Sequence, residues 1–381
     1  MNGGLSREQN GFRERVRSFV ENEISHARAD ALDRGDAFPH DILEKMAQQG
    51  LTAVNVPVHY GGEGGGDLEV MILCEELSRR SPALSWVLGN VILYGNNIIG
   101  VNGSEAQRNL FLPSLAKGRL LFAFGLTEPD AGSDAANINT TAQCQDSGPW
   151  IVTGGKTFIT GGTVADYVVT FARTAPPRYK GITAFLVDTR DSGFSFSKIE
   201  KLGFRGSDTA TLYFDQVPVP EEMILGGPEG LNRGWSQMVR LLNGERLSLA
   251  ACSLGIGQAA FDAALDHVRQ LPPPAVAGSR QATEHLLAEM AAQLEAARAL
   301  AYRTAWMHTN KMECVRETSM SKLFCSETAK KIAVDAMAIM GPDGCDMALA
   351  AQRRLRDVLI LSIGGGTSQI QKNIVAKTLG L

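Results

Sequence analysis

The stretch Phe124–Asp134 (FGLTEPDAGSD) marks the point at which the sequence changes from one structural pattern to another. It starts at the end of a short apolar run and passes at once into a turn rich in Gly, Pro, Ser and Asp. A strand that ends in such a turn offers backbone amides and hydroxyls to a phosphate or to the polar edge of a ring. The same composition also suits an Asx or Ser/Thr turn without a ligand, so the residues alone leave both interpretations open.

Before this stretch the pattern is helical, and after it strands follow. Apolar residues at helical spacing predict helices from Arg13 to Ile24, at 67–80 and at 85–101, with a short one after Ser104. The helix at 85–101 is apolar almost all round and is therefore expected to be buried. Apolar and β-branched runs then predict strands at residues 120–124, 150–153, 157–160, 167–171, 182–187, 194–196 and 210–214.

From Leu231 onward the helical period returns, with predicted helices at residues 235–269, 281–307, 319–340, 346–361 and 370–379. The order helical, β, helical predicts an α+β protein of three parts. These are an N-terminal helical domain (1–118), a middle β-barrel or sandwich domain (119–228) and a C-terminal four-helix-bundle domain (229–381).

Composition excludes several classes of function. The 381 residues carry a formal net charge of −4, which gives no basic footprint for nucleic acid. The six cysteines form no C-x-x-C pair, so we expect buried free thiols and neither a metal site nor disulfides. The N-terminus is polar, and we find no apolar run of the roughly 18 residues that a membrane span needs. We therefore expect a cytoplasmic protein without a membrane span.

Three motifs resemble the acyl-CoA dehydrogenase family. The run Thr127–Asp134 matches the signature Thr-Glu-Pro-x-Ala-Gly-Ser-Asp, and Gly154–Gly161 resembles Gly-x-Lys-x-Trp-Ile-Thr-Asn, with Phe158 in place of Trp. The run Gly364–Gln371 resembles Tyr-Glu-Gly-Thr-Ser-Glu/Gln-Ile-Gln. The resemblance covers nearly the whole chain and implies the acyl-CoA dehydrogenase fold.

The resemblance also implies an FAD cofactor. Phe158 would stack on the flavin, because aromatic planes pack on one another, and Thr160 would donate its hydroxyl toward the flavin nitrogen that accepts hydride. From the residues alone, a core aromatic and an ordinary strand hydroxyl are the more common interpretations. The complete set that the family implies for the cofactor is Phe124, Leu126, Thr127, Gly132, Ser133, Phe158, Thr160, Thr367 and Gln369.

The catalytic carboxylate of the family is missing from its usual position, which here is Gly365. A minority of the family, the isovaleryl-CoA dehydrogenases among them, supplies the base from an earlier helix, where this chain has Glu245 followed by Arg246. The resemblance therefore implies Glu245 as the base, with the backbone amide of Gly365 retained as a donor to the thioester carbonyl. The alternative is that Glu245 is a surface carboxylate paired with an arginine.

Chemistry supports a carboxylate in this role. A base must lie within about 3 Å of the α carbon whose proton it removes. A carboxylate becomes more basic when substrate expels water from around it. The resemblance thus implies FAD-dependent α,β-dehydrogenation of an acyl thioester on CoA or an acyl-carrier protein. It also implies electron transfer to an electron-transferring flavoprotein, and a homo-oligomer, either a dimer or a tetramer.

Two other functions remain open on the sequence. One is a flavin-dependent monooxygenase on the same fold, and the other is a non-catalytic subunit of a hetero-oligomeric dehydrogenase. The second draws support from residues 269–278 and 338–344, where the family's contacts to the FAD of a neighbouring subunit are altered. Gly364 and Gly365 also replace the bulkier Tyr and Glu, which suggests room for a branched or otherwise wide acyl group.

Overall fold

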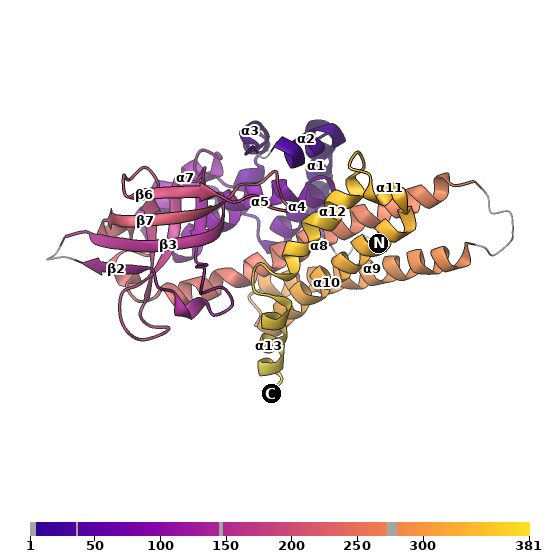
Figure 1. Ribbon diagram of the computed structural model, residues 1–381. Coiled ribbons are helices and arrows are strands. Elements are labelled where there is room, and N and C mark those ends of the chain that lie inside the picture. Colours follow the sequence, from indigo (N-terminus) through magenta and orange to yellow (C-terminus); the bar gives the residue numbers. More distant parts are fainter. Residues whose placement is uncertain (1–4, 36, 145–147, 273–279) are drawn as a thin grey trace.

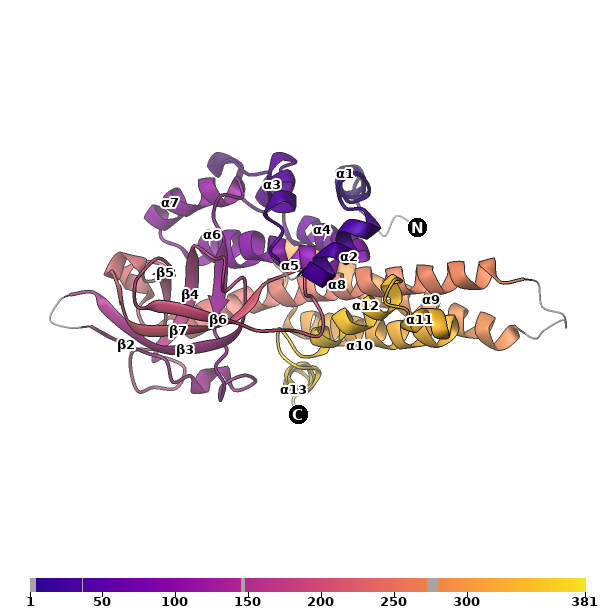
Figure 2. The same ribbon diagram turned by 45° about the horizontal axis from the view of Figure 1, so that its top comes forward.

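The computed structural model describes residues 5–35, 37–144, 148–272 and 280–381. The molecule is elongated, with a β sheet at one end and long C-terminal helices at the other (Figure 1). The N-terminal helices lie along one side of both parts, which is clearest after a 45° rotation (Figure 2). The predicted order of helical, β and helical parts is therefore confirmed.

The N-terminal part consists of short helices around two helices, α4 and α5, whose residues are mostly buried. Ser6 starts the first helix as an N-cap whose side chain accepts from the amide of Gln9. The predicted helix at 85–101 is right in extent, but its middle turn is π-helical rather than α-helical. The elements are α1 (Arg7–Glu23), α2 (His26–Gly35), α3 (His40–Gln48), α4 (Asp67–Arg80), α5 (Pro82–Val91), η3 (Ile92–Asn97), α6 (Ile98–Asn102) and α7 (Glu105–Ala116).

The predicted middle β domain is present as one curled seven-stranded sheet. The strands are β1 (Phe122–Gly125), β2 (Thr141–Cys144), β3 (Trp150–Thr160), β4 (Tyr167–Arg173), β5 (Ile182–Asp188), β6 (Phe194–Lys198) and β7 (Thr209–Val219). Their order is β1-β4-β2-β3-β7-β6, with β5 pairing β4. The two strands predicted at 150–153 and 157–160 are a single strand with irregular register, and β2 was not predicted.

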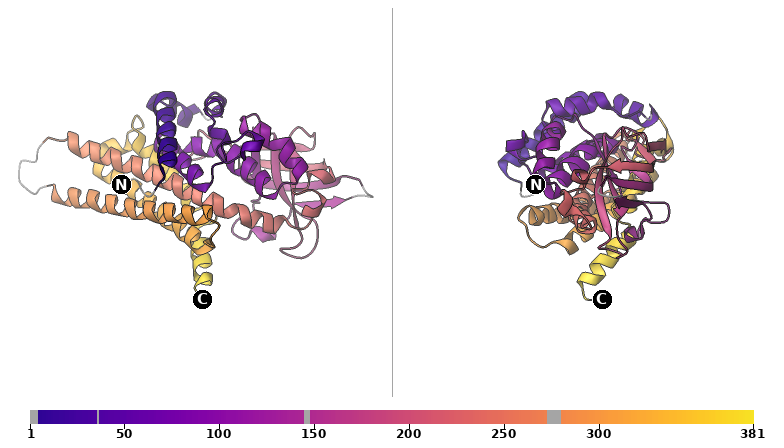
Figure 3. Two further views of the ribbon diagram at one scale, coloured as in Figure 1. Left: turned by 180° about the vertical axis from the view of Figure 1, so that it is seen from behind. Right: turned by 90° about the vertical axis from the view of Figure 1, so that its left-hand side faces the viewer.

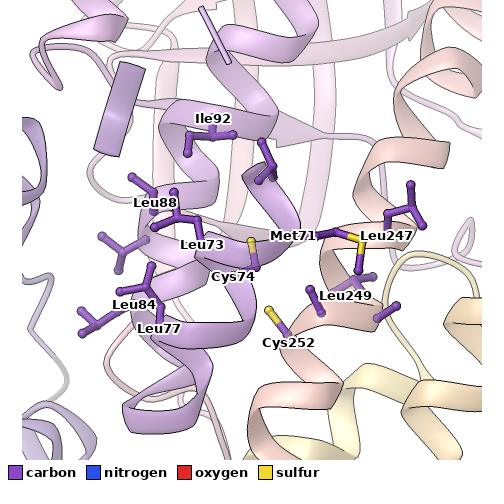
Figure 4. Packing of buried hydrophobic residues seen from close by; sticks show 14 of the residues in the cluster. Met71, Leu73, Cys74, Leu77, Leu84, Leu88, Ile92, Leu247, Leu249 and Cys252 are labelled. Atoms are coloured by element: carbon purple, nitrogen blue, oxygen red, sulfur yellow. The ribbon is translucent and has the colours of Figure 1, made fainter. Parts of the chain in front are cut away.

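The C-terminal part is organised around one long helix, α8 (Gly234–Gln270), which packs against α4 and α10. Leu247, Leu249 and Cys252 of α8 face Met71 and Cys74 of α4 across the core (Figure 4). The other elements are α9 (Gln281–Thr309), α10 (Val315–Met340), α11 (Pro342–Cys345), α12 (Ala350–Val358), η7 (Leu359–Ser362) and α13 (Ser368–Thr378). Helix α13 projects away from the body of the molecule (Figure 3).

Two helical stretches, Pro82–Asn102 and Gly234–Gln270, are long and apolar enough to cross a membrane by length and composition. The expectation that the chain has no such run is therefore wrong. Within their most apolar windows, 67% and 78% of the residues are buried in protein, as in the core helices of a folded domain. The prediction of buried free thiols holds for four cysteines, while Cys144 and Cys345 are exposed.

Candidate active site

A strained aromatic residue stands at the irregular part of β3. The pairing of β3 with β7 slips between Lys156 and Ile159, and Phe158 within the slip has a left-handed φ of 58°. Its side chain is 68% exposed, although it lies on a central strand. A non-glycine residue held in this region costs about 1–3 kcal/mol and is typical of functional sites. Phe158 is therefore accessible and is not the core aromatic that the residues alone favoured.

A buried ion pair holds the neighbouring turn in place. Lys156 Nζ lies 2.7 Å from Glu128 Oε1, and both side chains are almost fully buried. Glu128 also accepts from the amides of Asn139 (2.6 Å) and Thr140 (3.0 Å), which lie beyond the turn. Burial opposes ionisation of Glu128, but Lys156 and these donors outweigh it and lower the pKa of its carboxyl. Glu128 therefore links the start of the turn to the residues that follow it.

The turn itself leaves its polar groups accessible. Gly132 and Ser133 are exposed, and Leu126 and Thr127 are half-buried beside them. The carbonyl of Thr127 accepts from the amide of Thr157 at 2.8 Å, which joins the turn to the strand that carries Phe158. An exposed aromatic plane beside free amides and hydroxyls fits a cofactor with an aromatic ring and phosphates, and so fits FAD.

Asn90 ties a helix to the end of this strand. Its Nδ2 donates to the carbonyl of Phe122 at 2.9 Å and to that of Thr160 at 3.1 Å. Asn90 is fully buried, and the adjacent Gly161 has a φ of 73° and no space for a Cβ against the Asn90 side chain. The position of Thr160 is therefore set by α5 as well as by the sheet.

The second half of the site lies on α8. Glu245 belongs to the part of this helix near Tyr94 of η3 and Lys322 of α10, and both side chains influence its carboxyl. Burial raises the pKa of the Glu245 carboxyl, and this effect outweighs the opposing influence of Arg246, Lys322 and Tyr94. The carboxylate is thus poised to take up a proton more readily than an exposed glutamate.

Position 365 disfavours any side chain. Gly365 has a φ of 62°, which favours glycine, and an added Cβ would come closer than 3.0 Å to Leu249 Cδ1. Leu249 lies four residues after Glu245, so both point from the same face of α8. The leucine thus occupies the space in which the family places its usual base, and Glu245 lies one turn away.

This packing corrects one expectation. The Cβ position at Gly365 is occupied by Leu249 Cδ1, so the glycine itself leaves no open space there. Gly364 is different, because the nearest atom to an added Cβ there is the Ile360 carbonyl oxygen at 3.6 Å. Room for a wide acyl group can therefore come from position 364 and not from position 365.

Three side chains orient the turn that contains Gly365. Arg246 Nε lies 3.4 Å from the Gly365 carbonyl, and Lys322 Nζ donates to the Gly366 carbonyl at 2.8 Å. Gln371 Nε2 donates to both carbonyls, at 3.1 and 3.0 Å. With its carbonyls held, the turn leaves the Gly365 amide without a protein acceptor among the described residues. That free amide is the donor that the sequence resemblance implies for the thioester.

The remaining predicted residues lie at the start of α13. Thr367 is the N-cap of this helix, since its Oγ1 accepts from the amide of Ile370 at 3.2 Å, and Gln369 is exposed. Arg269 lies in the last turn of α8 beside Asp266 (3.5 Å), not in a strand-like loop. Most of the altered stretch 269–278 falls on residues 273–279, which lie outside the described residues.

Sequence reasoning missed four contributors: Tyr94, Asn90, Leu249 and Lys322. The first two lie in the helical stretch that was singled out only for its apolar character. Their polar side chains within that stretch were the available signal, because a buried polar group requires a partner. Leu249 and Lys322 gave no signal, since a leucine and a lysine on helices have ordinary interpretations.

Comparison with known proteins agrees with the geometry. Family models for the N-terminal, middle and C-terminal domains of acyl-CoA dehydrogenases match residues 6–119, 123–217 and 232–380. An acyl-CoA dehydrogenase of Bacillus subtilis (strain 168) is 39% identical over 380 residues, covering 98% of each chain. A caffeyl-CoA reductase-Etf complex subunit, CarC, of Acetobacterium woodii is 34% identical over 98% of this chain and 99% of its own.

A solved structure, the butyryl-CoA dehydrogenase of Megasphaera elsdenii, superimposes with a TM-score of 0.94 at 30% identity and covers 99% of each chain. The similarity therefore extends over all three parts of the molecule and includes both halves of the site. The chain belongs to the acyl-CoA dehydrogenase family, whose members are FAD-dependent oxidoreductases acting on the CH–CH bond of acyl-CoA thioesters.

Proposed function

We propose that Glu245 is the general base of this acyl-CoA dehydrogenase and removes the α proton of the thioester. The observation that carries the proposal is the packing of Leu249 into the space beside Gly365. Because Glu245 and Leu249 share one face of α8, the carboxylate approaches the same region from the helix. This placement resembles the isovaleryl-CoA dehydrogenase subgroup.

The surroundings of Glu245 suit a base. Burial raises the pKa of its carboxyl, while Arg246 and Lys322 keep the ionised form accessible. Substrate that displaces water would raise this basicity further. The free Gly365 amide would donate to the thioester carbonyl and so acidify the α proton. Arg246 would then act through the turn, because its contact is with the Gly365 carbonyl.

For the cofactor, we propose that Phe158 stacks on the flavin ring and that Thr160 donates its hydroxyl to the ring edge. Leu126, Thr127, Gly132 and Ser133 would contact the ring and the phosphates. Bound FAD would supply the acceptor for the β hydride. We assign Phe124 to the flavin side of the pocket, and Thr367 and Gln369 to the adenosine half.

The substrate class that fits best is a branched or otherwise wide acyl group, because Gly364 leaves open space at the site. The thioester would be carried by CoA, with an acyl-carrier protein as the variant to be tested. An electron-transferring flavoprotein would be the redox partner, as the name of the Acetobacterium relative indicates for that protein. The same base and the same ring serve either direction of the reaction, so the acceptor and the equilibrium decide its direction.

We also propose a homo-oligomer, either a dimer or a tetramer. Leu379 and Leu381 follow the projecting α13 and are exposed, and Phe324 and Val334 are exposed on α10. Apolar side chains of this size on the projecting and outer helices are expected to be covered by another subunit. Light scattering of the purified protein would distinguish a monomer from either assembly.

The experiment for the function is an anaerobic titration of the FAD-loaded protein with straight, branched and cyclic acyl-CoA thioesters and with an acyl-carrier protein thioester. Bleaching of the oxidised flavin band by branched or cyclic acyl-CoA is expected. Bleaching by the carrier-protein thioester alone would show that the substrate is bound to a carrier protein and not to CoA. No bleaching by any thioester would contradict dehydrogenation.

A further inference from the structure

We propose that a cavity beside the catalytic base binds a hydroxyl group at the end of the acyl chain or of one of its branches, so that the enzyme prefers ω-hydroxyacyl thioesters to plain acyl thioesters. The proposal rests on the proposed function, in which an acyl thioester lies beside Glu245. It names one substituent of that acyl group, and it comes from polar side chains that the proposed reaction does not use.

The cavity has a volume of about 140 Å³ and lies between η3, α4 and α8. Asn97 lines it from η3 and Asp67 from the start of α4, while Gly244 and Ser248 line it from α8. Ser248 follows Glu245 by three residues, which makes the two neighbours on the helix surface. The cavity therefore begins next to the base, where the far end of an acyl chain can enter it.

A hydrogen-bond acceptor and a donor face the same point on the wall of this cavity. A Cβ built on Gly244 would lie 3.6 Å from Asp67 Oδ1 and 3.1 Å from Asn97 Nδ2. Because position 244 has no side chain, nothing on α8 separates these two atoms from the cavity in front of them. One small polar group of a ligand can thus contact both.

Asp67 is held in place through its other oxygen. Its Oδ2 lies 2.6 Å from Nδ1 of His308, in the last turn of α9. Its Oδ1 has no hydrogen-bond partner among the residues that the structure describes. The hydrogen bond to Asp67 raises the pKa of His308 above its ordinary value, so the imidazolium partly balances the charge of the carboxylate. Asp67 therefore offers the cavity one free, oriented acceptor.

Asn97 offers a free amide from a turn that is fixed by other contacts. Its side chain makes no hydrogen bond to any part of the chain that the structure describes. The preceding residue, Asn96, is buried and donates through Nδ2 to the Thr52 carbonyl at 2.8 Å and to Asn55 Oδ1 at 3.0 Å. A π-helical turn such as η3 is rare and is frequent at functional sites. The backbone that carries Asn97 is thus positioned before any ligand binds.

A hydroxyl is the group that suits this pair. It donates one hydrogen bond, here to Asp67 Oδ1, and accepts another, here from Asn97 Nδ2. A methyl group would leave both atoms without a partner and away from water, which weakens binding. A protonated amine has no lone pair for the Asn97 amide and brings a second positive charge beside His308. A carboxylate would be repelled by Asp67.

The test compares ω-hydroxyacyl-CoA thioesters over a short series of chain lengths with the acyl-CoA thioesters in which a methyl replaces the hydroxyl. Binding is followed by the flavin spectrum of the FAD-loaded Glu245→Gln variant, and kcat/KM is measured with the wild type. At the best chain length the hydroxylated thioester is expected to be favoured by roughly 10- to 100-fold, as for a hydrogen bond to a charged group. Equal or weaker binding of the hydroxylated thioester at every length would overturn the proposal, as would tighter binding of an ω-aminoacyl-CoA.

Two variants assign the preference to this cavity. Asn97→Leu keeps the size of the side chain and removes its amide, and Gly244→Ala places a methyl in front of Asp67 Oδ1 and Asn97 Nδ2. Each is expected to lower the ratio of hydroxylated to plain thioester to about one or below. The ratio compares two substrates on one protein, so a partial loss of folded enzyme does not move it.

Asn10→Leu is the matched control. It also removes a half-buried asparagine from a helix, but on α1, where Asn10 Nδ2 donates to the Leu5 carbonyl at 3.2 Å. Its ratio is expected to equal that of the wild type. A preference that survives in both Asn97→Leu and Gly244→Ala would overturn the proposal, and so would an equal fall in Asn10→Leu.

The design also separates this proposal from the one beneath it. If Glu245→Gln keeps its activity, the base assignment fails, while the ratio of kcat/KM values in the wild type still decides the hydroxyl site. If Glu245→Gln is inactive and shows no preference for the hydroxylated thioester, the hydroxyl site fails and the base assignment stands.

Discussion

Substituting Gly365 tests why this chain has moved its base. Position 365 has a φ of 62°, and an added Cβ there would clash with Leu249 Cδ1. Gly365→Ala therefore meets two separate penalties, one from the backbone and one from packing. Neither depends on catalysis, so both are measurable as stability.

The expected magnitude follows from these two effects. A left-handed conformation costs an ordinary residue about 1–2 kcal/mol, and an extra carbon in a packed site costs about 1–3 kcal/mol. Gly365→Ala should therefore lower the free energy of unfolding by about 2–5 kcal/mol. Combining it with Leu249→Ala should remove the packing part and leave the backbone part, a compensation of about 1–3 kcal/mol.

The adjacent glycine is the control. An added Cβ at Gly364 would meet only the Ile360 carbonyl oxygen, at 3.6 Å. Gly364→Ala is thus expected to be neutral or to stabilise by up to about 1 kcal/mol, because alanine restricts the unfolded chain. Urea unfolding of the two variants, followed by far-UV circular dichroism, gives the comparison.

Two results would refute this reasoning. One is a Gly365→Ala variant that is as stable as Gly364→Ala. The other is an active Glu245→Gln, Gly365→Glu double variant, because position 365 disfavours any side chain.

Two further predictions concern the flavin side of the site. Phe158→Leu should weaken FAD binding by roughly 2- to 10-fold, measured by quenching of flavin fluorescence, without lowering the stability of the cofactor-free protein, because the exposed ring packs on no core; a stability loss with unchanged affinity would contradict it. Glu128→Gln should lower the free energy of unfolding by about 3–5 kcal/mol, because it leaves Lys156 buried and unpaired. Burial lowers the pKa of Lys156 to about 8 from 10.5, and because Glu128 raises this pKa, its loss lowers the pKa of Lys156 further in the variant. Above its folded pKa the unfolded chain holds the extra proton and stability rises with pH, so this rise begins at lower pH in the variant than in the wild type. The deficit measured in urea should therefore be smaller at pH 9 than at pH 6, and a larger deficit at pH 9 would contradict this.

The sequence predicted the order of the three parts because hydrophobic periodicity changes sharply near residues 120 and 231. It predicted the middle β domain but not the order of its strands, since strand pairing depends on contacts between distant residues. Strand β3 was divided in two because its glycines and irregular register resemble a turn in sequence. The π-helical turn was not predicted either, and its contacts are also distant in sequence, since Asn96 donates to the Thr52 carbonyl and Gly95 packs against Leu115.

The candidate site also has parts that the local sequence predicts and parts that depend on contacts between distant residues. The turn around Gly132 and the strand that carries Phe158 were recognised because the local sequence determines both, and their contacts to FAD stay a prediction. The packing of Leu249 against Gly365 joins residues 116 positions apart, so no local pattern could reveal it. The vacancy expected beside Gly365 was therefore wrong, although the glycine itself had been recognised as the departure from the family.

The role of Glu245 is the central claim, and the most direct test is the rate at which excess acyl-CoA bleaches the flavin of a Glu245→Gln variant under anaerobic conditions. Glu295→Gln is the matched control, because Glu295 is a surface carboxylate on a helix, 3.0 Å from Arg298. The account predicts that Glu245→Gln binds FAD normally and bleaches at least about 10²–10⁴-fold more slowly than the wild type, while Glu295→Gln is unchanged. A Glu245→Gln rate within a few-fold of the wild type would contradict the account.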